Sequence, residues 1–390
     1  MKKIFKYAML FAAACTLSFG VAACGDDENE KPAGGVDTID PEKAADLDYN
    51  DTYAAQWGNY MAVVSNLLKQ DAQSLYDAWT GGYATLFKTH NSDEYPSALS
   101  CVEQILDGCI DIAGEVGDQK IGEPYRLYVD GKTTEALYAV ESWYSWHSRE
   151  DYRNNIYSIR NSYYGNIYDE DKSNYDVVDA NSLSAVLAKV NPELDATAKA
   201  KIKAAADAIW AIQQPFRNNI NTSATVAAMD ACADLGDFIE NELKPAFSDI
   251  DEATLSPVVT QYVDAVVLPT YKLLAERNAA LDVAVNAFKA NPSDAAFTAC
   301  ANAWLAARQP WESSEAFLFG PVDELGLDPN MDSWPLDQAQ IAQILKSGDF
   351  SELTWKEGDS DQDIEDAQSL RGFHTLEFFI FKDGQPRKVK

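Results

Sequence analysis

Apolar residues recur every three or four positions along most of this chain, a spacing that predicts helices with one buried face. Between Leu47 and Lys88 the series begins with Trp57, Met61 and Val64. No run of alternating β-branched residues and no credible hairpin signal interrupts the pattern. Beyond residue 88 the pattern predicts helices over residues 96–116, 135–159, 181–190, 192–221, 222–247, 256–291, 293–317, 337–346 and 363–381. We therefore expect an all-α protein.

Long helices joined by short connections favour antiparallel bundles. A chain of 390 residues is long enough for two or three domains. The natural break between two sets of predicted helices lies at residues 248–256. We expect two packed antiparallel helical bundles with a site at their interface, the first covering residues 44–250 and the second residues 251–390.

The first residues form an export signal rather than part of the fold. Lys2, Lys3 and Lys6 precede an apolar stretch that is too short and wrongly flanked for a membrane span. This signal peptide, residues 1–23, ends in a sequence that resembles a bacterial lipobox, which implies cleavage before Cys24 and lipidation of its sulfur. The alternative is an ordinary signal peptide that happens to contain a cysteine.

The segment after the signal, residues 24–43, is rich in Gly, Asp, Glu and Pro, so it is predicted to be a flexible acidic linker. Residues 25–28 resemble the acidic signal that sends some Gram-negative lipoproteins to the outer face of the membrane. We expect a lipid-anchored protein of the outer membrane, either periplasmic or exposed on the cell surface, with the membrane as one partner.

Charge and cysteine content narrow the classes of function. Lys and Arg number 31 against 62 Asp and Glu, a net charge of −31, which repels a phosphate backbone and argues against a nucleic-acid partner. Three histidines are present, and no His-Glu-x-x-His zinc motif. Cys101 and Cys109 share one predicted helix and lie too far apart on it for a disulfide. We expect these two, Cys232 and Cys300 to be small buried apolar residues.

The C-terminal helix carries a histidine and a glutamate three positions apart, His374 and Glu377, on one helical face. Such a pair can bind a divalent transition metal, or it can form a hydrogen bond in which the acid fixes the tautomer of the imidazole. Apolar neighbours at Leu370 and residues 378–381 indicate that the pair is at least partly desolvated. It must then be mutually satisfied or completed by groups from elsewhere.

A second cluster lies at the end of the helix predicted over residues 293–317. Arg308, Glu312 and Glu315 share a face there, next to Trp311. One interpretation is a solvated surface ion pair, which stabilises little. The aromatic residues that crowd this helix end favour the other interpretation, a partly buried group.

A third cluster gathers hydroxyls, a histidine, acids and aromatic residues within eleven positions. Trp and Tyr side chains with polar tips often line binding clefts. The alternative is a helix whose aromatic side chains pack into the core while its polar groups cap turns. The polar residues of this cluster are Glu141, Ser142, Ser145, His147, Ser148, Arg149, Glu150 and Asp151.

Taken together, the three clusters resemble the imelysin family, whose signature Gly-x-His-x-x-Glu is matched by Gly372, His374 and Glu377. The resemblance covers residues 47–382 and includes the segments 267–271 and 332–337. The other positions that match are Arg308, Trp311, Glu312, Glu315, Glu141, Ser142, Ser145, Ser148 and Asp151.

The order of the segments departs from the commoner layout of the family, in which the half that carries the signature comes first. This chain looks circularly permuted. Permutation is compatible with a site that is assembled at the seam between two bundles. We therefore expect His374, Glu377, Glu312 and Arg308 to face Ser145 and its neighbours across an interdomain cleft.

The resemblance implies an all-helical, extracytoplasmic protein associated with iron uptake, and we expect it to bind iron or an iron-bearing ligand in the cleft. Possible partners then include other iron-uptake proteins, and the cofactor or cargo would be iron or another divalent metal. The family is also classed among metallopeptidases with the His-x-x-Glu pair, here His374 and Glu377, as metal ligands, so a peptidase is the alternative. The third hypothesis is a structural surface protein in which the three clusters are buried polar networks.

Overall fold

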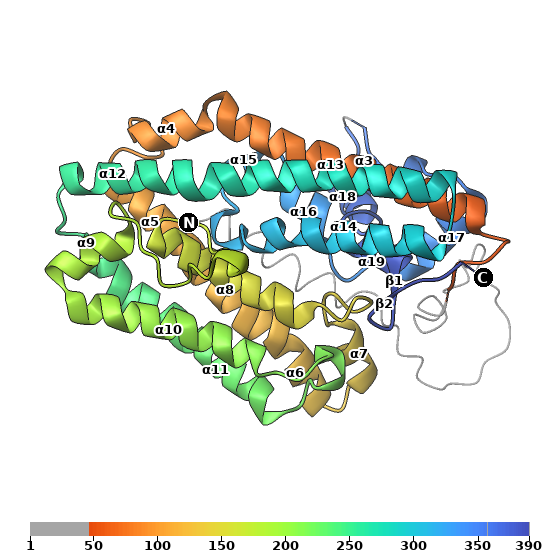
Figure 1. The fold of residues 1–390 in the computed structure, drawn as a ribbon, viewed down its shortest axis with the longest axis horizontal. Coiled ribbons are helices and arrows are strands. Elements are labelled where there is room, and N and C mark those ends of the chain that lie inside the picture. Colours follow the sequence, from red (N-terminus) through yellow and green to blue (C-terminus); the bar gives the residue numbers. More distant parts are fainter. Residues whose placement is uncertain (1–46, 357, 390) are drawn as a thin grey trace, which may run out of the picture. The chain divides into compact units, whose positions relative to one another are not determined.

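The structure, a computed structural model, describes residues 47–356 and 358–389, and the described part is built almost wholly of helices (Figure 1). The all-α prediction is confirmed. The helices are α3 (Ala54–Ala78), α4 (Ala84–Thr89), α5 (Ala98–Gly114), α6 (Gly122–Val129), α7 (Thr133–Tyr138), α8 (Ser148–Tyr164), α9 (Leu183–Val190), α10 (Pro192–Trp210), α11 (Ser223–Phe238), α12 (Glu252–Tyr262), α13 (Leu268–Ala290), α14 (Asp294–Glu312), α15 (Pro321–Glu324), α16 (Leu327–Asp332), α17 (Gln338–Ser347), α18 (Asp361–Gln368) and α19 (Phe373–Ile380).

Four of the long helices continue through a π-helical turn into the next element. These turns are η1 (Trp79–Tyr83), η2 (Glu115–Ile121), η5 (Ile239–Leu243) and η7 (Val263–Val267). Short 3₁₀ turns are η3 (Glu170–Lys172), η4 (Phe216–Asn218), η6 (Lys244–Phe247), η8 (Glu315–Phe317) and η9 (Ser351–Leu353). Strands β1 (Phe381–Lys382) and β2 (Gln385–Pro386) form a minimal hairpin after α19, where no hairpin was predicted. The strands are too short to leave an alternating pattern in the sequence.

Local capping chemistry fixes several helix starts. The Ser97 and Ser100 side chains form a reciprocal capping box at α5. The predicted cap at Thr222 is confirmed, because its hydroxyl accepts the Thr225 N–H at 3.2 Å. Pro192 opens α10 as expected, since a residue at the first helical position needs no amide hydrogen.

Two groups of helices pack side by side. In one, α3 lies along α13, which packs on α14, and α19 contacts both α3 and α14. In the other, α10 packs on α8 and α11, and α5 contacts α8 and α11. The groups meet where α14 and η8 contact α8. The predicted boundary at residue 250 assigns α3 to the first bundle, but α3 packs on α13, which belongs to the second. All of the described residues belong to one compact unit. The two-domain division stays a prediction.

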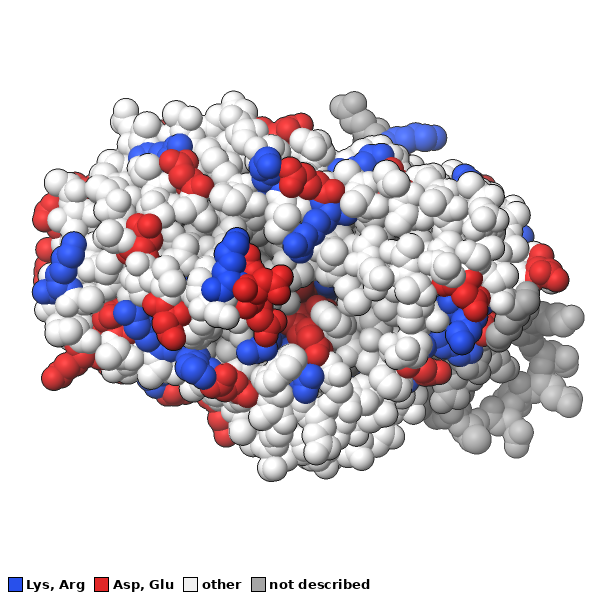
Figure 2. Space-filling model, in the orientation of Figure 1, with Lys and Arg blue, Asp and Glu red and all other residues white. Residues whose placement is uncertain are grey.

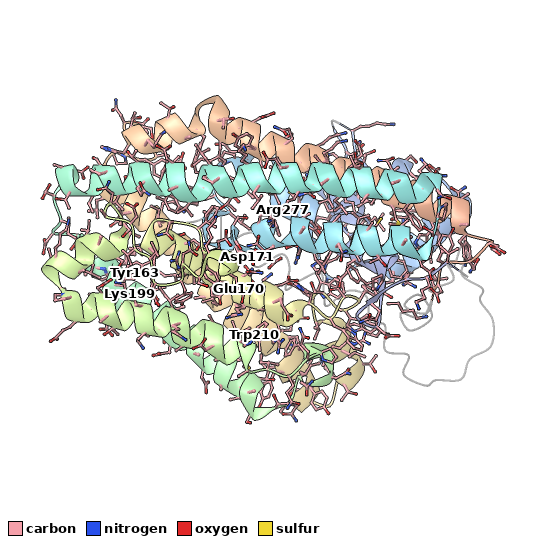
Figure 3. All side chains as sticks on the ribbon, in the orientation of Figure 1. Tyr163, Glu170, Asp171, Lys199, Trp210 and Arg277 are labelled. Carbon is pink, nitrogen blue, oxygen red and sulfur yellow. The ribbon has the colours of Figure 1, made fainter. Side chains whose placement is uncertain are left out.

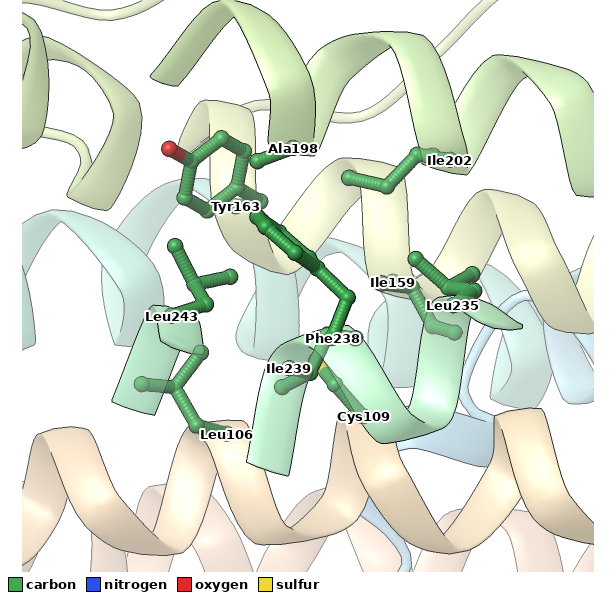
Figure 4. Close-up of a pocket in the computed structure, with 10 residues that line it drawn as sticks. All are labelled: Leu106, Cys109, Ile159, Tyr163, Ala198, Ile202, Leu235, Phe238, Ile239 and Leu243. Atoms are coloured by element: carbon green, nitrogen blue, oxygen red, sulfur yellow. The ribbon is translucent and has the colours of Figure 1, made fainter. Parts of the chain in front are cut away.

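The second group has an apolar centre. Ten side chains from α5, α8, α10, α11 and η5 converge there (Figure 4), and the hydroxyl of Tyr163 leaves this centre to bond Asp195 at 3.0 Å.

At the surface, Trp210 ends α10 (Figure 3) and packs under two guanidinium groups from α8. Those of Arg149 and Arg153 lie 3.9 and 4.4 Å from the centre of the Trp210 ring. These contacts hold α8, which carries part of the site, against α10.

All four cysteines among the described residues are free and buried, as predicted. Desolvation raises the pKa of Cys101, Cys232 and Cys300 to about 12, so these thiols stay protonated and unreactive at neutral pH. Within the described ranges, no helix combines the length and apolar character that a bilayer crossing requires. The predicted signal peptide, the lipidated Cys24 and the linker lie outside the described residues.

Candidate functional site

The centre of the site is Arg308, which is fully buried at the interface of α14, α8 and α16. Its Nη2 lies 2.6 Å from Oε1 of Glu312, its Nη1 pairs with Asp332, and its Nε lies 3.6 Å from Oδ2 of Asp151. One guanidinium therefore holds carboxylates from three helices. The interpretation of Arg308 and Glu312 as a solvated surface pair is wrong, because neither side chain reaches solvent.

His374, in the first turn of α19, sits between two carboxylates. Its Nε2 lies 3.1 Å from Oδ1 of Asp332, and its Nδ1 lies 3.1 Å from Oε2 of Glu377. Burial and the nearby Arg308 oppose a charged imidazole, but the two hydrogen bonds outweigh them and raise the pKa of His374 to about 9. At neutral pH the side chain is therefore an imidazolium that donates both of its N–H groups.

Glu377 is held by backbone from another part of the chain. Its Oε1 accepts the N–H groups of Tyr144 at 3.1 Å and Ser145 at 2.7 Å. The loop that supplies them, residues 139–147, was predicted to be helical, and this prediction is wrong. Ser142 and Trp146 adopt left-handed backbone conformations, with φ of 50° and 63°. This strained backbone turns amide groups toward Glu377. In a regular helix the same amide groups would bond carbonyl groups of the helix itself.

The signature glycine has a steric role. Gly372 has a φ of 92° and directly precedes α19, and a Cβ at this position would lie 2.6 Å from the backbone oxygen of Met331. Only glycine fits a backbone of this conformation so close to α16. Gly372 thereby sets how closely His374 approaches Asp332.

Asp151, in the first turn of α8, is the acceptor for the third cluster. Its Oδ2 accepts from the Ser142 hydroxyl, and its Oδ1 lies 3.0 Å from Nδ1 of His147. Burial opposes ionisation of Asp151, but His147 and Arg308 outweigh it and lower its pKa. The Ser148 hydroxyl donates to the backbone oxygen of Glu141 at 2.6 Å, so this serine fixes the loop rather than presenting a free nucleophile.

Asn155 and Asp332 also belong to the network, and sequence reasoning did not single out either of them for the site. Asn155 donates to Oε2 of Glu312 at 2.6 Å, and the indole of Trp311 donates to Oδ2 of Asp332 at 2.7 Å. Asp332 lies within a segment that matched the family, but its carboxylate was not proposed for the site. Asn155 follows Asp151 by four positions on α8, which is the only signal in the sequence that could have suggested it.

An acidic group formed by Glu312, Glu315 and Asp332 lies beside Arg308, with one carboxylate oxygen of each within 4.8 Å of the others. Glu315 is 8% exposed, and its carboxylate forms no hydrogen bond or ion pair with any described residue. Burial raises the pKa of Glu312 to about 8 and raises that of Glu315 well above its usual range. Both carboxyl groups therefore hold protons at neutral pH, and a bound cation would take the place of those protons.

Glu141 faces a different cation. Its carboxylate lies 3.0 Å from Nζ of Lys120, a buried lysine on η2 whose Nζ is also 3.3 Å from Oε1 of Glu115. Lys120 was not proposed from the sequence, because a single lysine in a helix gives no signal that it is buried.

The structure therefore brings the three sequence clusters together. Glu377 links the signature helix to Ser145, and Arg308 links the second cluster to Asp151. The predicted approach of His374 to the Ser145 loop is confirmed by the contacts of Glu377. The side chains that link the clusters are buried. The charged groups visible on the surface in Figure 2 therefore belong to exposed residues outside the site, such as Glu170 and Asp171, which Figure 3 labels. The predicted cleft and the role of His374 and Glu377 as metal ligands stay predictions.

Comparisons with known proteins agree with the all-helical fold. The sequence model of the Imelysin family matches residues 27–240 and 267–389. The chain is also similar to an imelysin peptidase from Bacteroides ovatus, whose crystal structure superposes on it with a TM-score of 0.86. The two sequences are 56% identical, and the match covers 89% of this chain and 100% of the Bacteroides ovatus chain.

Two iron-regulated relatives match shorter stretches. Iron-regulated protein A from Synechococcus elongatus is 34% identical over 125 residues, 32% of this chain and 31% of the relative, so this chain matches about a third of the length of that curated relative. A putative iron-regulated protein A precursor from Parabacteroides distasonis is 34% identical over 42% of each chain, with a TM-score of 0.32. Because the family model matches well over half of its residues, this chain belongs to the imelysin family.

Proposed function

We propose that this chain binds iron as a cation at the acidic group of Glu312, Glu315 and Asp332, and that it serves iron uptake as a lipid-anchored protein outside the cytoplasm. The relatedness to the imelysin family and to a protein named iron-regulated protein A supports a role connected with iron. The lipid anchor at Cys24, the outer-membrane location, an iron-bearing ligand in place of the free ion, and other iron-uptake proteins as partners belong to the same proposal.

One observation carries the proposal: the Glu315 carboxylate is buried without a hydrogen bond or ion pair among the described residues, and it points toward Glu312 and Asp332. An uncompensated buried carboxylate is costly. A cation bound between the three oxygens would compensate Glu315 and Glu312 together.

The donor atoms suit iron. Carboxylate oxygens are hard ligands that bind Fe³⁺, Fe²⁺, Mn²⁺ and similar ions. His374 suits a metal less well, because a ligating imidazole must be neutral and both of its nitrogens already donate to carboxylates. The Glu377 oxygens are likewise engaged, by His374 and by two backbone N–H groups. The geometry therefore favours the acidic group over the His374 and Glu377 pair as the cation ligands.

A metallopeptidase is the alternative. The name of the Bacteroides ovatus relative describes that protein as a peptidase. Hydrolysis at a metal would need an ion with an open coordination position and a base that activates water. His147 is the imidazole best placed for such a base, since Asp151 fixes its Nδ1 and its side chain is 27% exposed.

Titration calorimetry tests the binding proposal. The chain from residue 47 onward would be titrated with Fe²⁺ under anaerobic conditions, with Mn²⁺ as an air-stable probe, and with ferric citrate. We expect saturable binding of one Fe²⁺ or Mn²⁺ per chain. Glu315→Gln should weaken it at least about a hundredfold, because it removes a charged ligand and leaves the shape of the side chain.

The matched control is Glu324→Gln, which changes an exposed glutamate nine positions further along the chain. It should leave the affinity unchanged. Binding that is absent in the unaltered chain, or equal in Glu315→Gln and the control, would contradict the proposal. A different outcome would assign the ion to the signature pair. In that case the His374→Gln, Glu377→Gln double variant would lose binding, whereas Glu315→Gln would bind as the unaltered chain does.

A further inference from the structure

Arg153, on α8, differs from every other arginine in the part of the chain that the structure describes. The other eight each donate a hydrogen bond to a described residue. The guanidinium of Arg153 forms neither a hydrogen bond nor an ion pair with any described residue. Asp and Glu outnumber Lys and Arg by 62 to 31, so a shortage of acids does not explain why this arginine has no partner.

Aromatic rings hold the side chain of Arg153 and leave its outer edge free. The guanidinium carbon lies 4.4 Å from the centre of the Trp210 ring and 5.0 Å from that of Tyr157. The Nε is buried and has no hydrogen-bond partner, whereas the two terminal nitrogens reach solvent. Nη1 and Nη2 therefore present an outward-facing pair of donors, the arrangement that binds both oxygens of a carboxylate.

Trp210 adds an apolar surface beside these donors. The residue ends α10 (Figure 3) and is 42% exposed. Arg149 keeps it in place, because its guanidinium carbon lies 3.9 Å from the ring centre and its Nη1 donates to the backbone oxygen of Ile212 at 3.2 Å. The charge of Arg149 is already paired with Glu150 at 3.1 Å. The unpaired charge next to the exposed indole is therefore that of Arg153.

We propose that Arg153 and Trp210 form a binding site for a small aromatic carboxylate. The ligand's two carboxylate oxygens accept hydrogen bonds from Nη1 and Nη2 of Arg153, and its ring packs on the exposed part of Trp210. An ion pair at the surface contributes little by itself. A carboxylate held by two parallel hydrogen bonds, with an aromatic ring in contact with the indole, gains both attractions at once.

This site is separate from the acidic group. Asp151, two positions before Arg153 on α8, points to Arg308, and residues two apart do not share a helical face. Helix α10 contributes no member of the acidic group. The inference therefore does not rest on the proposed binding of a cation.

Nuclear magnetic resonance of the ¹⁵N-labelled chain from residue 25 onward tests the site, with benzoate as the probe. The signals to follow are the Nε–H of Arg153 and the indole N–H of Trp210. Each is assigned by its loss in Arg153→Gln or in Trp210→Leu. We expect both signals to shift along one saturable curve as benzoate is added. Benzamide, which lacks the charge, and acetate, which lacks the ring, should each bind at least about tenfold more weakly.

Variants locate the bound benzoate, and each is followed at the signal that it keeps. Arg153→Gln should weaken binding at least about tenfold, and Trp210→Leu at least about fivefold. Arg153→Lys keeps the charge but not the paired donors, so it should weaken binding at least about threefold. The matched control is Arg126→Gln, which removes an exposed arginine of α6 that pairs with Asp118, and it should leave the affinity unchanged.

The outcomes decide the inference even where a variant does not fold. Saturable shifts of both signals, with benzoate bound more tightly than benzamide and acetate, support the site. No saturable shift in the unaltered chain, or equal affinity for benzoate and either of the other two compounds, would overturn it. Equal weakening by Arg153→Gln and Arg126→Gln would also overturn it, because the effect would then follow the total charge. None of these results bears on the Mn²⁺ and Fe²⁺ titrations that test the proposed function.

Discussion

The backbone N–H of Ser145 lies 2.7 Å from Oε1 of Glu377, although 232 positions separate the two residues in the chain. This contact joins the loop before α8 to the signature helix α19. It places the negative charge of Glu377 where it can also hold His374. The charged interior is therefore built by segments from distant parts of the sequence, and its stability depends on each contact between them.

Glu377→Ala should lower the free energy of unfolding by about 3 kcal/mol or more. The change leaves the N–H groups of Tyr144 and Ser145 without an acceptor and strips one carboxylate from the buried imidazolium of His374. Urea unfolding followed by circular dichroism measures it. Glu365→Ala, at an exposed position of α18, serves as the control and should change stability by less than about 0.5 kcal/mol. Equal effects would mean that the contacts of Glu377 do not stabilise the fold.

Stability should fall as the pH rises from about 6.5 to 9.5. The pKa of His374 is about 9 in the folded protein and near 6.5 when unfolded, so its stabilisation is complete below pH 6.5 and disappears as the pH rises through 9. Glu312, whose pKa burial raises to about 8, acts in the same direction, because the folded state holds its proton more tightly than the unfolded chain. The expected loss due to His374 is about 3 kcal/mol.

Thermal unfolding in buffers from pH 6 to 10 measures this loss, and His374→Gln provides the comparison. The variant should be less stable at pH 6 but should lose less stability between pH 7 and 9.5. A flat profile for the unaltered chain over this range would show that His374 is neutral in the folded state.

Cation binding should raise the thermal stability. A ligand that binds only the folded state at a hundred times its Kd adds about 2.7 kcal/mol to the free energy of unfolding. Mn²⁺ added to the chain from residue 47 should therefore raise Tm, and Glu315→Gln should abolish the rise. Addition of a chelator should reverse it. A similar rise in both proteins would place the ion away from the acidic group.

Gly372→Ala should destabilise the protein by about 3 kcal/mol or more, because the added Cβ would lie 2.6 Å from the Met331 oxygen in a backbone with φ of 92°. Gly131→Ala is the matched control: its φ of 82° is similar, but nothing lies within 4 Å of its Cβ position. The control should cost only the strain of the left-handed backbone, about 1 kcal/mol. Denaturant midpoints of the two variants separate steric overlap from backbone strain.

The sequence by itself determined the helices, their caps and the nature of the cysteines. Helical periodicity is a property of neighbouring residues, and so are the capping roles of Thr222 and Pro192. The spacing of His374 and Glu377 likewise predicted their contact, because residues three apart share a helical face. The motifs also named many of the residues that meet at the site, but not Asn155 or Asp332.

Tertiary structure decided the rest. It turned the aromatic stretch at residues 139–147 from an expected helix into a loop, because the amide groups bonded Glu377 rather than their own helix. It buried Arg308 among three carboxylates and paired the buried Lys120 with Glu115 and Glu141. Burial and charge compensation depend on segments that lie hundreds of residues apart, and no local pattern along the chain records which of them will meet.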